Sequence, residues 1–519
     1  MESNKQDGLA KWLALLVVVV GTFMAILDTS IVNIAIPKMM AVFGVSADEI
    51  SWVITAYMLT MGTVIPLTGY LGDKFGTKKV YIWALISFTI GSALCGFAWS
   101  NTSMIVARII QAIGGGMIMP VSMSIIYQVI PQEERGMALG FWGIAAMAAP
   151  AIGPTLSGYI VENMDWRLIF TLNIPVGIIA VIMTAVLLEE FPVRPTKGFD
   201  LLGFVTVAGG LACILYVLGE GNSIDWGEFK NIFLLITGVF GLILFIVNEL
   251  TCENPLLDLR IMKIWPFTLS VMISSALNIA LFGGVFLLPL FLQNLQGLTA
   301  MQSGIIMFPS AVATGITMPI GGKLFDKFGG KPVVVPGIML LAYSTYELAQ
   351  INLDTSTTAI IWITIIRGLG LGLAMMPAST SGMNAVPMHL IGRASALSNV
   401  IRQVAGSAGI TVLTSYMQNV QVTSYNRIAE QINWYNPQSL QLFKMVQGMF
   451  LQSGISRADS EGASLGTLYG LVMKQSTMVA ISDTFYFTFL IAFGTVFLAM
   501  LIGKKRAMQA SGEKPVIMD

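Results

Sequence analysis

The amino-acid sequence predicts an all-α polytopic membrane protein with 14 membrane spans, built as two six-helix halves and two inserted helices. Of its 519 residues, 55% are hydrophobic and only 11% are charged. Soluble globular proteins contain about 25% charged residues, so most of this chain is expected to lie in a bilayer. An internal repeat divides the spans into the two halves.

Apolar windows bounded by charged residues, glycine or proline define the spans. A helical window of about 20 residues crosses the hydrocarbon core of a bilayer. The first window begins at Trp12 and is too long for a signal peptide, so we expect it to be retained. The windows lie near 12–36, 51–71, 80–98, 104–127, 137–160, 168–188, 201–219, 231–250, 267–291, 303–322, 332–350, 358–383, 394–417 and 479–503.

The distribution of lysine and arginine predicts the orientation. With the N-terminus placed inside, 18 of the 28 Lys and Arg residues fall in inside segments, 7 in outside segments and 3 within spans. An excess of these residues marks cytoplasmic loops. The sequence therefore predicts an even number of spans and two cytoplasmic termini.

Three short stretches recur in the same order along the chain. "GYLGDKFGTKKV" (69–80) is echoed by "GGKLFDKFGGKPVV" (321–334), "ARIIQAIGGGMIMPVS" (107–122) by "ITIIRGLGLGLAMMPAS" (363–379), and "RGMALG" (135–140) by "GRASALS" (392–398). Such paired six-span halves are typical of secondary transporters. The expected units are an N-terminal half at 1–190, two inserted helices at 191–262 and a C-terminal half at 263–519.

Five motifs resemble those of a known family. "GYLGDKFGTKK" resembles the loop between spans 2 and 3 of the major facilitator superfamily, "RIIQAIGGGMIMP" its proton-driven span-4 motif, and "AAPAIGPTLSGYI" its antiporter span-5 motif. "LDTSIVNIAIP" and "WRLIFTLNIPVG" resemble motifs of the fourteen-span drug:proton antiporters, the EmrB/QacA type. The resemblance implies the major facilitator fold, with pseudo-twofold symmetry. It also implies proton-driven multidrug efflux, and with it antibiotic resistance.

The repeated loop is expected to gate the transport cycle. Its glycines allow close backbone approach, and Asp73 can accept hydrogen bonds from amides at the start of span 3. Glu133, Glu134 and Arg135 in the next inside loop are expected to pair with charged residues of this loop. The alternative is a topology anchor without a gating role. The candidate gating residues are Gly69, Gly72, Asp73, Gly76, Lys78 and Asp326.

Span 5 carries the antiporter-like motif, with Pro150, Gly153, Pro154 and Gly158. Small residues let membrane helices pack closely, and Pro154 removes a backbone hydrogen bond. The resemblance implies a hinge that keeps the cavity from leaking protons, whereas packing alone is the alternative.

Asp28 lies well inside the first span, where an ionisable residue is costly and points to function. Arg108 in span 4 lies at a similar depth and is the expected partner. Burial disfavours the charged carboxylate and a neighbouring guanidinium favours it, so a change in their separation would load or release a proton. The alternative is a static buried ion pair.

The substrate cavity is expected between spans 1, 4, 9 and 12. Its candidate residues are Thr22, Thr29, Asn33, Gln111, Asn278, Phe282, Phe286 and Arg367. For each Phe, lipid-facing or packing roles are equally consistent with the sequence. Charges singled out in the second half are Glu347 and Arg402, and span 10 contains no acid within its membrane part. Some members of the family that this chain resembles export divalent organic cations and carry an additional acid in span 10, so the resemblance implies monovalent cations, neutral lipophiles or weak organic acids as better substrates than dications.

Other classes of function are disfavoured. The chain has no P-loop and no HExxH motif, and its one histidine, His389, supports no catalytic triad, so neither an enzyme nor an ATP-driven pump is expected. No cofactor or metal site is predicted. The alternatives are export of a specific metabolite, lipid or siderophore, and a non-transporting receptor or scaffold. The long outside loop 418–478 is expected to cap the exit or lie on the membrane. The resemblance implies a further possibility, because some relatives work with an extracytoplasmic adaptor that leads to an outer-membrane channel, which this loop could dock.

Overall fold

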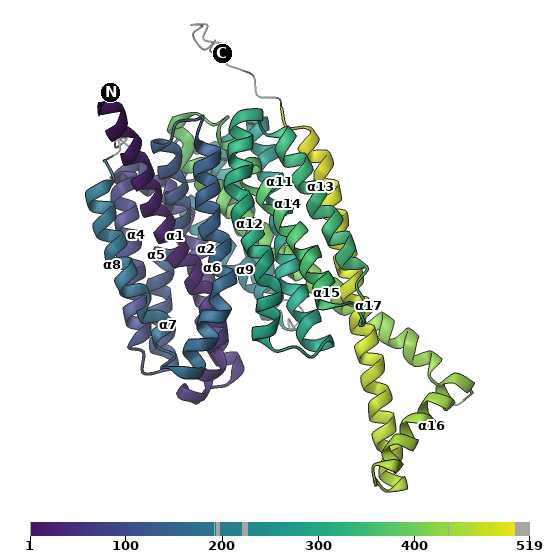
Figure 1. Cartoon of the computed structure of the whole chain (residues 1–519). Helices are drawn as coiled ribbons and strands as arrows, with labels where there is room; N and C mark the ends of the chain where they lie inside the picture. The colour runs from purple at the N-terminus through teal and green to yellow at the C-terminus, as the bar shows by residue number, and fades with distance from the viewer. Residues whose placement is uncertain (1, 191–192, 194–197, 221–226, 434, 504–519) are drawn as a thin grey trace.

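The computed structural model describes residues 2–190, 193, 198–220, 227–433 and 435–503, which are helical almost throughout and contain no strand (Figure 1). The first eight helices are α1 (Glu2–Phe43), α2 (Ala47–Val64), α3 (Leu67–Phe75), α4 (Thr77–Gly96), α5 (Asn101–Val129), α6 (Arg135–Asn163), α7 (Leu168–Thr171) and α8 (Asn173–Leu187). The next two are α9 (Leu201–Glu220) and α10 (Phe229–Thr251). The last seven are α11 (Trp265–Leu290), α12 (Ala300–Phe328), α13 (Lys331–Ala349), α14 (Thr357–Met383), α15 (Ile391–Gln431), α16 (Pro437–Gln452) and α17 (Arg457–Met500).

Each predicted span falls on helical structure. Among the described residues, eleven helices are long and apolar enough to cross a membrane, and a twelfth span results if α2 and α3, bent by 54°, are joined. The helices α6 and α15 are not among these, so the count of fourteen stays a prediction. The chain is a multi-pass, all-helical membrane protein.

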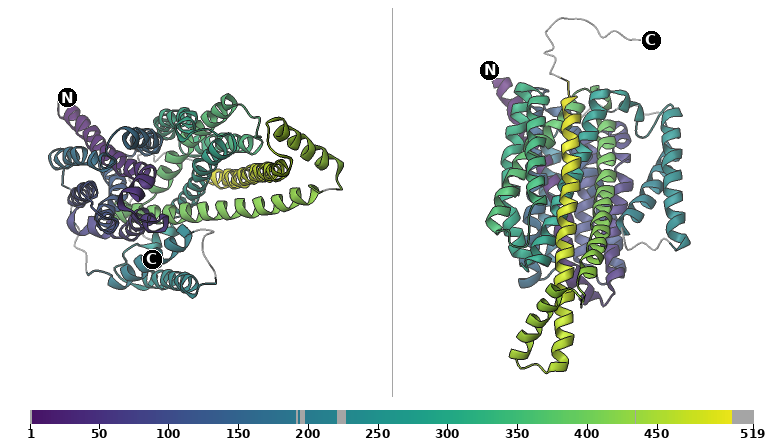
Figure 2. Two further views of the ribbon diagram at one scale, coloured as in Figure 1. Left: turned by 90° about the horizontal axis from the view of Figure 1, so that it is seen from below. Right: turned by 90° about the vertical axis from the view of Figure 1, so that its right-hand side faces the viewer.

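The helices pack in two groups, which we call the first half (α1–α8) and the second half (α11–α17). They meet along a seam where α6 packs on α12, and where α3 and α5 pack on α15. We call the end where α1 begins and α17 ends the terminal face, and the opposite end the hairpin face (Figure 1). The pair α9 and α10 lies outside both groups, with α9 against α2 and α15 (Figure 2).

Glycine ends the helices of the repeated loops. Gly76 separates α3 from α4 with φ of 90°, and Gly329 follows α12 with φ of 83°. Residues with a Cβ rarely adopt these left-handed backbone angles. The two glycines occupy matching positions of the two echoed loops, so both loops turn sharply at the terminal face.

The loop 418–478, which is expected on the outside, is largely helical. The helix α15 continues to Gln431, α16 follows, and α17 begins at Arg457, well before the predicted span. Together they form a hairpin that projects from the hairpin face, with α16 packed against α17 (Figures 1 and 2). Phe443 and Val446 are the buried residues of α16.

Candidate functional site

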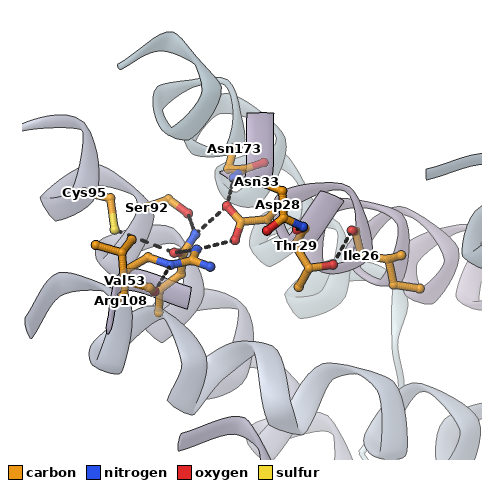
Figure 3. Close-up of polar contacts among 10 residues, drawn as sticks. Ile26, Asp28, Thr29, Asn33, Val53, Ser92, Cys95, Arg108 and Asn173 are labelled. Carbon is orange, nitrogen blue, oxygen red and sulfur yellow. Dashed lines mark hydrogen bonds and ion pairs between the residues drawn. The ribbon is translucent and has the colours of Figure 1, made fainter. Parts of the chain in front are cut away.

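Asp28 and Arg108 form an ion pair inside the first half. The guanidinium NH1 of Arg108, on α5, lies 2.6 Å from Oδ2 of Asp28, on α1 (Figure 3). The side chains are 2% and 0% exposed, respectively. The predicted pairing is therefore present in the structure, although its role in proton transfer is a separate matter.

The second carboxylate oxygen is held by two amides. Oδ1 of Asp28 accepts hydrogen bonds from Gln111 Nε2 at 2.8 Å and from Asn173 Nδ2 at 2.9 Å. Asn173 begins α8, so three helices converge on one carboxylate (Figure 3). Buried charges need this kind of complete hydrogen bonding to be tolerated.

Further groups fix Arg108. Its NH1 also donates to Gln111 Oε1 at 2.6 Å, and its Nε donates to the carbonyl of Val53 at 3.3 Å. The guanidinium carbon lies 3.9 Å from the ring centroid of Tyr57 on α2, a distance typical of a cation–π contact. Because Gln111 bonds both partners, separating Asp28 from Arg108 must rearrange the whole network.

The polar residues of α1 that are expected to line a cavity differ in exposure. Thr22 is fully buried and accepts a hydrogen bond from Trp142 Nε1 at 3.0 Å. Thr29 donates to the carbonyl of Ile26 at 2.7 Å, and exposed Asn33 bonds the carbonyl of Thr29 at 3.4 Å. Gln111 belongs to the acid network. Thr22, Thr29 and Asn33 share one face of the continuous helix α1, and their contact with substrate stays a prediction.

The two echoed loops tie the halves together at the terminal face. Asp73 Oδ2 lies 3.1 Å from Nε of Arg393, at the start of α15. Asp326 accepts from the backbone amides of Gly136 and Met137, each at 3.0 Å, at the start of α6. A carboxylate is favourable at a helix N-terminus. Each loop thus contacts a helix of the opposite half.

The other cross-seam hydrogen bonds in the described chain lie between the terminal face and mid-depth. Arg135 donates to Asn384 Oδ1 at 3.1 Å, and Ser395 donates to the carbonyl of Pro120 at 2.9 Å. The backbones also touch, because a Cβ built on Gly136 would lie 2.4 Å from the carbonyl oxygen of Gly322. The seam is closed on this side.

Some expected contacts of the loops are wrong. Glu134 pairs with Lys11 at 2.5 Å and not with the motif lysines. Lys78 donates to the carbonyl of Ala185 at 2.8 Å, and Lys79 lies 3.8 Å from Glu190. These partners lie within the first half, so the lysines bind their own half.

The span-5 motif lies on α6. A Cβ built on Gly153 would lie 2.3 Å from Ser30 Oγ, so α6 approaches α1 closely there. Pro150 is exposed, and its carbonyl accepts from Ser30 at 3.5 Å. A Cβ on Gly158 would meet no atom within 4 Å, and the side chain of Pro154 lies outside the described residues.

Most of the second-half candidates lie on α11 or contact it. Arg367 NH2 donates to the carbonyl of Ala280 at 2.5 Å, and Asn278 Nδ2 donates to the carbonyl of Arg402 at 3.1 Å. Phe282 is half-buried in the same region, whereas Phe286 packs in an apolar cluster near the hairpin face. Glu347 lies one turn after exposed Tyr343 on α13 and, among the described residues, forms no ion pair with Arg367 or Arg402.

Sequence reasoning missed three residues. Asn173 is the polar position in the motif "WRLIFTLNIPVG", a signal that could have been followed. Arg393 occupies the position in "GRASALS" that Arg135 occupies in "RGMALG", and this match was a signal that Arg393 has a structural role. Glu249 is completely buried within a predicted span, where it accepts from the amides of Leu256 and Leu257 at 3.1 and 3.2 Å and anchors the chain after α10.

Comparison with known proteins places the chain in a family. The sequence profile of the Major Facilitator Superfamily matches residues 18–410. The uncharacterized MFS-type transporter YhcA of Bacillus subtilis is 36% identical over 97% of this chain and 95% of its own length. The multidrug export protein EmrB of Escherichia coli is 30% identical over 92% of this chain and 93% of its own. The proton:xylose symporter XylE has a similar fold, with a TM-score of 0.59 at 13% identity over 96% of this chain and 97% of its own. The chain therefore belongs to the major facilitator superfamily of transporters.

Proposed function

We propose that this protein is a proton-coupled multidrug efflux transporter that exports lipophilic compounds from the cytoplasm by alternating access. The observation that carries the proposal is the buried Asp28–Arg108 pair with its convergent amide donors. An ionisable pair inside a membrane bundle points to a proton or ion pathway. The relative EmrB, named a multidrug export protein, supports export of drug-like molecules.

The coupling follows from the network. While Arg108 and Gln111 bond Asp28, the carboxylate is stabilised in its charged form. When the helices move apart and these donors withdraw while the carboxylate stays buried, the charged form loses its stabilisation and the carboxylate takes up a proton. Return of Arg108 to within 2.6 Å of Asp28 releases that proton. Substrate binds while Asp28 is deprotonated, and the conformational change that follows carries the substrate outward.

The terminal face is the cytoplasmic side in this proposal, with both termini in the cytoplasm of a bacterium and the chain in its inner membrane. The ties of Asp73 to Arg393 and of Asp326 to the start of α6 then close the cytoplasmic entrance. Breaking these ties opens the entrance to substrate. The terminal loops are accordingly a latch and not merely topology anchors.

The helical hairpin lies on the extracytoplasmic side in this orientation. Its projection away from the bundle supports docking of an extracytoplasmic adaptor protein that leads to an outer-membrane channel (Figure 1). Deletion of residues 432–456 tests this role. Export from whole cells should fall while transport in liposomes is unchanged, and equal losses in both systems would contradict it.

Proton flux in liposomes tests the proposed function. Purified protein is reconstituted with a pH-sensitive dye inside and an inward-directed proton gradient, and a lipophilic cation, a weak acid and a neutral drug are added in turn. Substrate-dependent proton flux is expected in the wild type and not in Asp28→Asn. The matched control is Asp354→Asn, an exposed acid outside the network. Flux that survives Asp28→Asn refutes coupling at this residue, and no flux with any compound favours a transporter of one specific metabolite.

A further inference from the structure

A cavity lies at the base of the helical hairpin, where α15 and α17 pass from the bundle into the hairpin (Figure 1). We call it the hairpin-base cavity. Its volume is about 460 Å³, and the end of α11, α15 and α17 supply its lining. Ligand pockets in proteins typically measure about 300–1,000 Å³. Its lining residues are distinct from those of the Asp28 network and of the terminal-face latch, so neither function accounts for it.

The α11 side of the cavity is formed by an unusual turn. The segment η3 (Phe291–Leu295) is a π-helix, in which the amide of Gln296 donates to the carbonyl of Phe291 at 3.2 Å. Such turns are rare in proteins and are frequently found at functional sites. Asn294 and Leu295 both line the cavity. The π-helical turn thus brings two consecutive residues, one polar and one apolar, to the same space.

The part of the cavity nearest the bundle is apolar. Leu290, Met417 and Ile481 line it from three helices. Each lies within two residues of the hairpin-face end of its expected span, where the hydrocarbon core of the bilayer ends. Acyl chain carbons are therefore available to contact this part of the lining.

The part farther from the bundle is polar and carries a positive charge. Asn294, Gln421 and Lys474 line it. They lie beyond the same span ends by about 5–8 Å along their helices. A bilayer of about 40–45 Å contains a hydrocarbon core of about 30 Å, so this depth corresponds to the headgroup layer. The cavity therefore crosses the boundary between acyl chains and headgroups.

The polar lining offers mainly hydrogen-bond donors. Gln421 Nε2 donates to Thr477 Oγ1 at 2.8 Å, and Thr477 donates to the carbonyl of Met473 at 2.7 Å. The second N–H of the Gln421 amide and the amide of Asn294 are thus available to a ligand. Lys474 is exposed and forms no ion pair with a carboxylate in the described part of the chain. Since the described lining contains neither Asp nor Glu, an anionic oxygen group is the complementary ligand.

We propose that the hairpin-base cavity binds an anionic phospholipid of the leaflet that borders the hairpin face. The phosphate lies at Lys474, and the beginning of an acyl chain lies against the apolar lining. Lysine at a membrane surface attracts anionic lipids, and the apolar lining favours a lipid over a soluble phosphate. The bound lipid bridges α11, α15 and α17 at the point where the hairpin leaves the bundle. This inference does not rest on the proposed export function, because the depth and chemistry of the cavity hold for either orientation of the chain.

Native mass spectrometry of the delipidated full-length protein in micelles tests the inference. Dissociation constants of the first bound lipid are measured for phosphatidylglycerol and phosphatidylcholine with identical acyl chains, which share the phosphate and differ in net charge. The wild type should bind phosphatidylglycerol about 5- to 10-fold more tightly, as expected for one lysine beside an anionic headgroup. Lys474→Gln should lower this ratio to below about 2, whereas Lys474→Arg should keep it. The control Lys444→Gln, exposed on α16 of the same hairpin, should also keep the wild-type ratio.

A second pair of variants tests the cavity rather than the charge. Gly470 lines the cavity, and a Cβ built on it would meet no atom within 4 Å, so leucine can be accommodated there without a clash. Gly470→Leu should occupy the space of the ligand and abolish the preference for phosphatidylglycerol. The control Gly466→Leu, one turn earlier on α17, is equally unobstructed but lies outside the lining, and should keep the preference.

Three results would overturn the inference. The first is equal binding of the two lipids by the wild type, and the second is a preference that survives both Lys474→Gln and Gly470→Leu. The third is displacement of phosphatidylglycerol by inorganic phosphate at an equal concentration, which would show a site for soluble anions and not for a lipid. Proton flux in phosphatidylcholine liposomes measures the proposed function separately, so the lipid site and the export function can fail independently.

Discussion

The latch at the terminal face gives the sharpest structural prediction. Asp73 and Arg393 are 18% and 19% exposed at their side chains and lie 3.1 Å apart. A hydrogen bond to a charged group contributes about 1.5–3 kcal/mol. Since 1.4 kcal/mol is a factor of ten in an equilibrium constant, Arg393→Gln should shift the balance toward the open terminal face by about 10- to 100-fold.

Electron–electron distance measurements test this shift. Spin labels are placed at Lys79 on α4 and Met388, just before α15, both exposed, after the three native cysteines are replaced. In the wild type the short distance should dominate, and Arg393→Gln should populate a longer one. Arg393→Lys should restore much of the short distance because it keeps the charge.

The control for this experiment is Arg427→Gln, which removes an arginine from the exposed part of α15 far from the latch. Its distance distribution should match that of the wild type. An unchanged distribution in Arg393→Gln, in protein that remains folded, would refute the latch. The Asp73–Arg393 contact would then be a topology anchor.

Three further predictions concern packing and the ion pair. Asp28→Asn and Arg108→Gln should each lower the free energy of unfolding in mixed micelles by about 3–5 kcal/mol, because each leaves a buried partner unpaired. The double variant should lose clearly less free energy than the sum of the two single losses. Additive losses would contradict the pairing. Gly140→Ala should impede closure of the terminal face and slow transport, since the new Cβ would lie 2.5 Å from the backbone of α12. The control Gly158→Ala should transport normally, because its new Cβ would meet no atom within 4 Å. Equal transport rates in the two variants would refute this interpretation. Tyr57→Phe should preserve transport, because the hydroxyl is buried without a partner. Tyr57→Leu should reduce transport, because it removes the ring that lies 3.9 Å from Arg108. A larger loss of transport in Tyr57→Phe than in Tyr57→Leu would show that the hydroxyl matters.

The sequence predicts part of the Asp28 site from the charges of its residues and their depths in the membrane. Asp28 and Arg108 are opposite charges at similar depths, so their pairing followed from helix rise alone. The role of Asn173 did not, because it depends on where α8 crosses α1. Helix crossing is a property of packing, which linear spacing does not specify.

The seam illustrates the same limit over a longer distance. Asp73 and Arg393 are 320 residues apart, and their pairing depends on how two helix bundles meet in one conformation. The repeat correctly grouped Asp73 with Asp326, since both contact a helix start of the opposite half. It did not predict that one carboxylate would bind a guanidinium and the other two amides.

The most direct test of the central claim separates substrate movement from proton coupling in Asp28→Asn. Substrate exchange across liposomes without a proton gradient should stay within a few-fold of the wild-type rate, because a neutral amide in place of the carboxylate does not block the conformational change. Accumulation driven by a proton gradient should be lost. If Asp28→Asn still accumulates substrate against its gradient, Asp28 is not the coupling residue and the proposed mechanism is wrong.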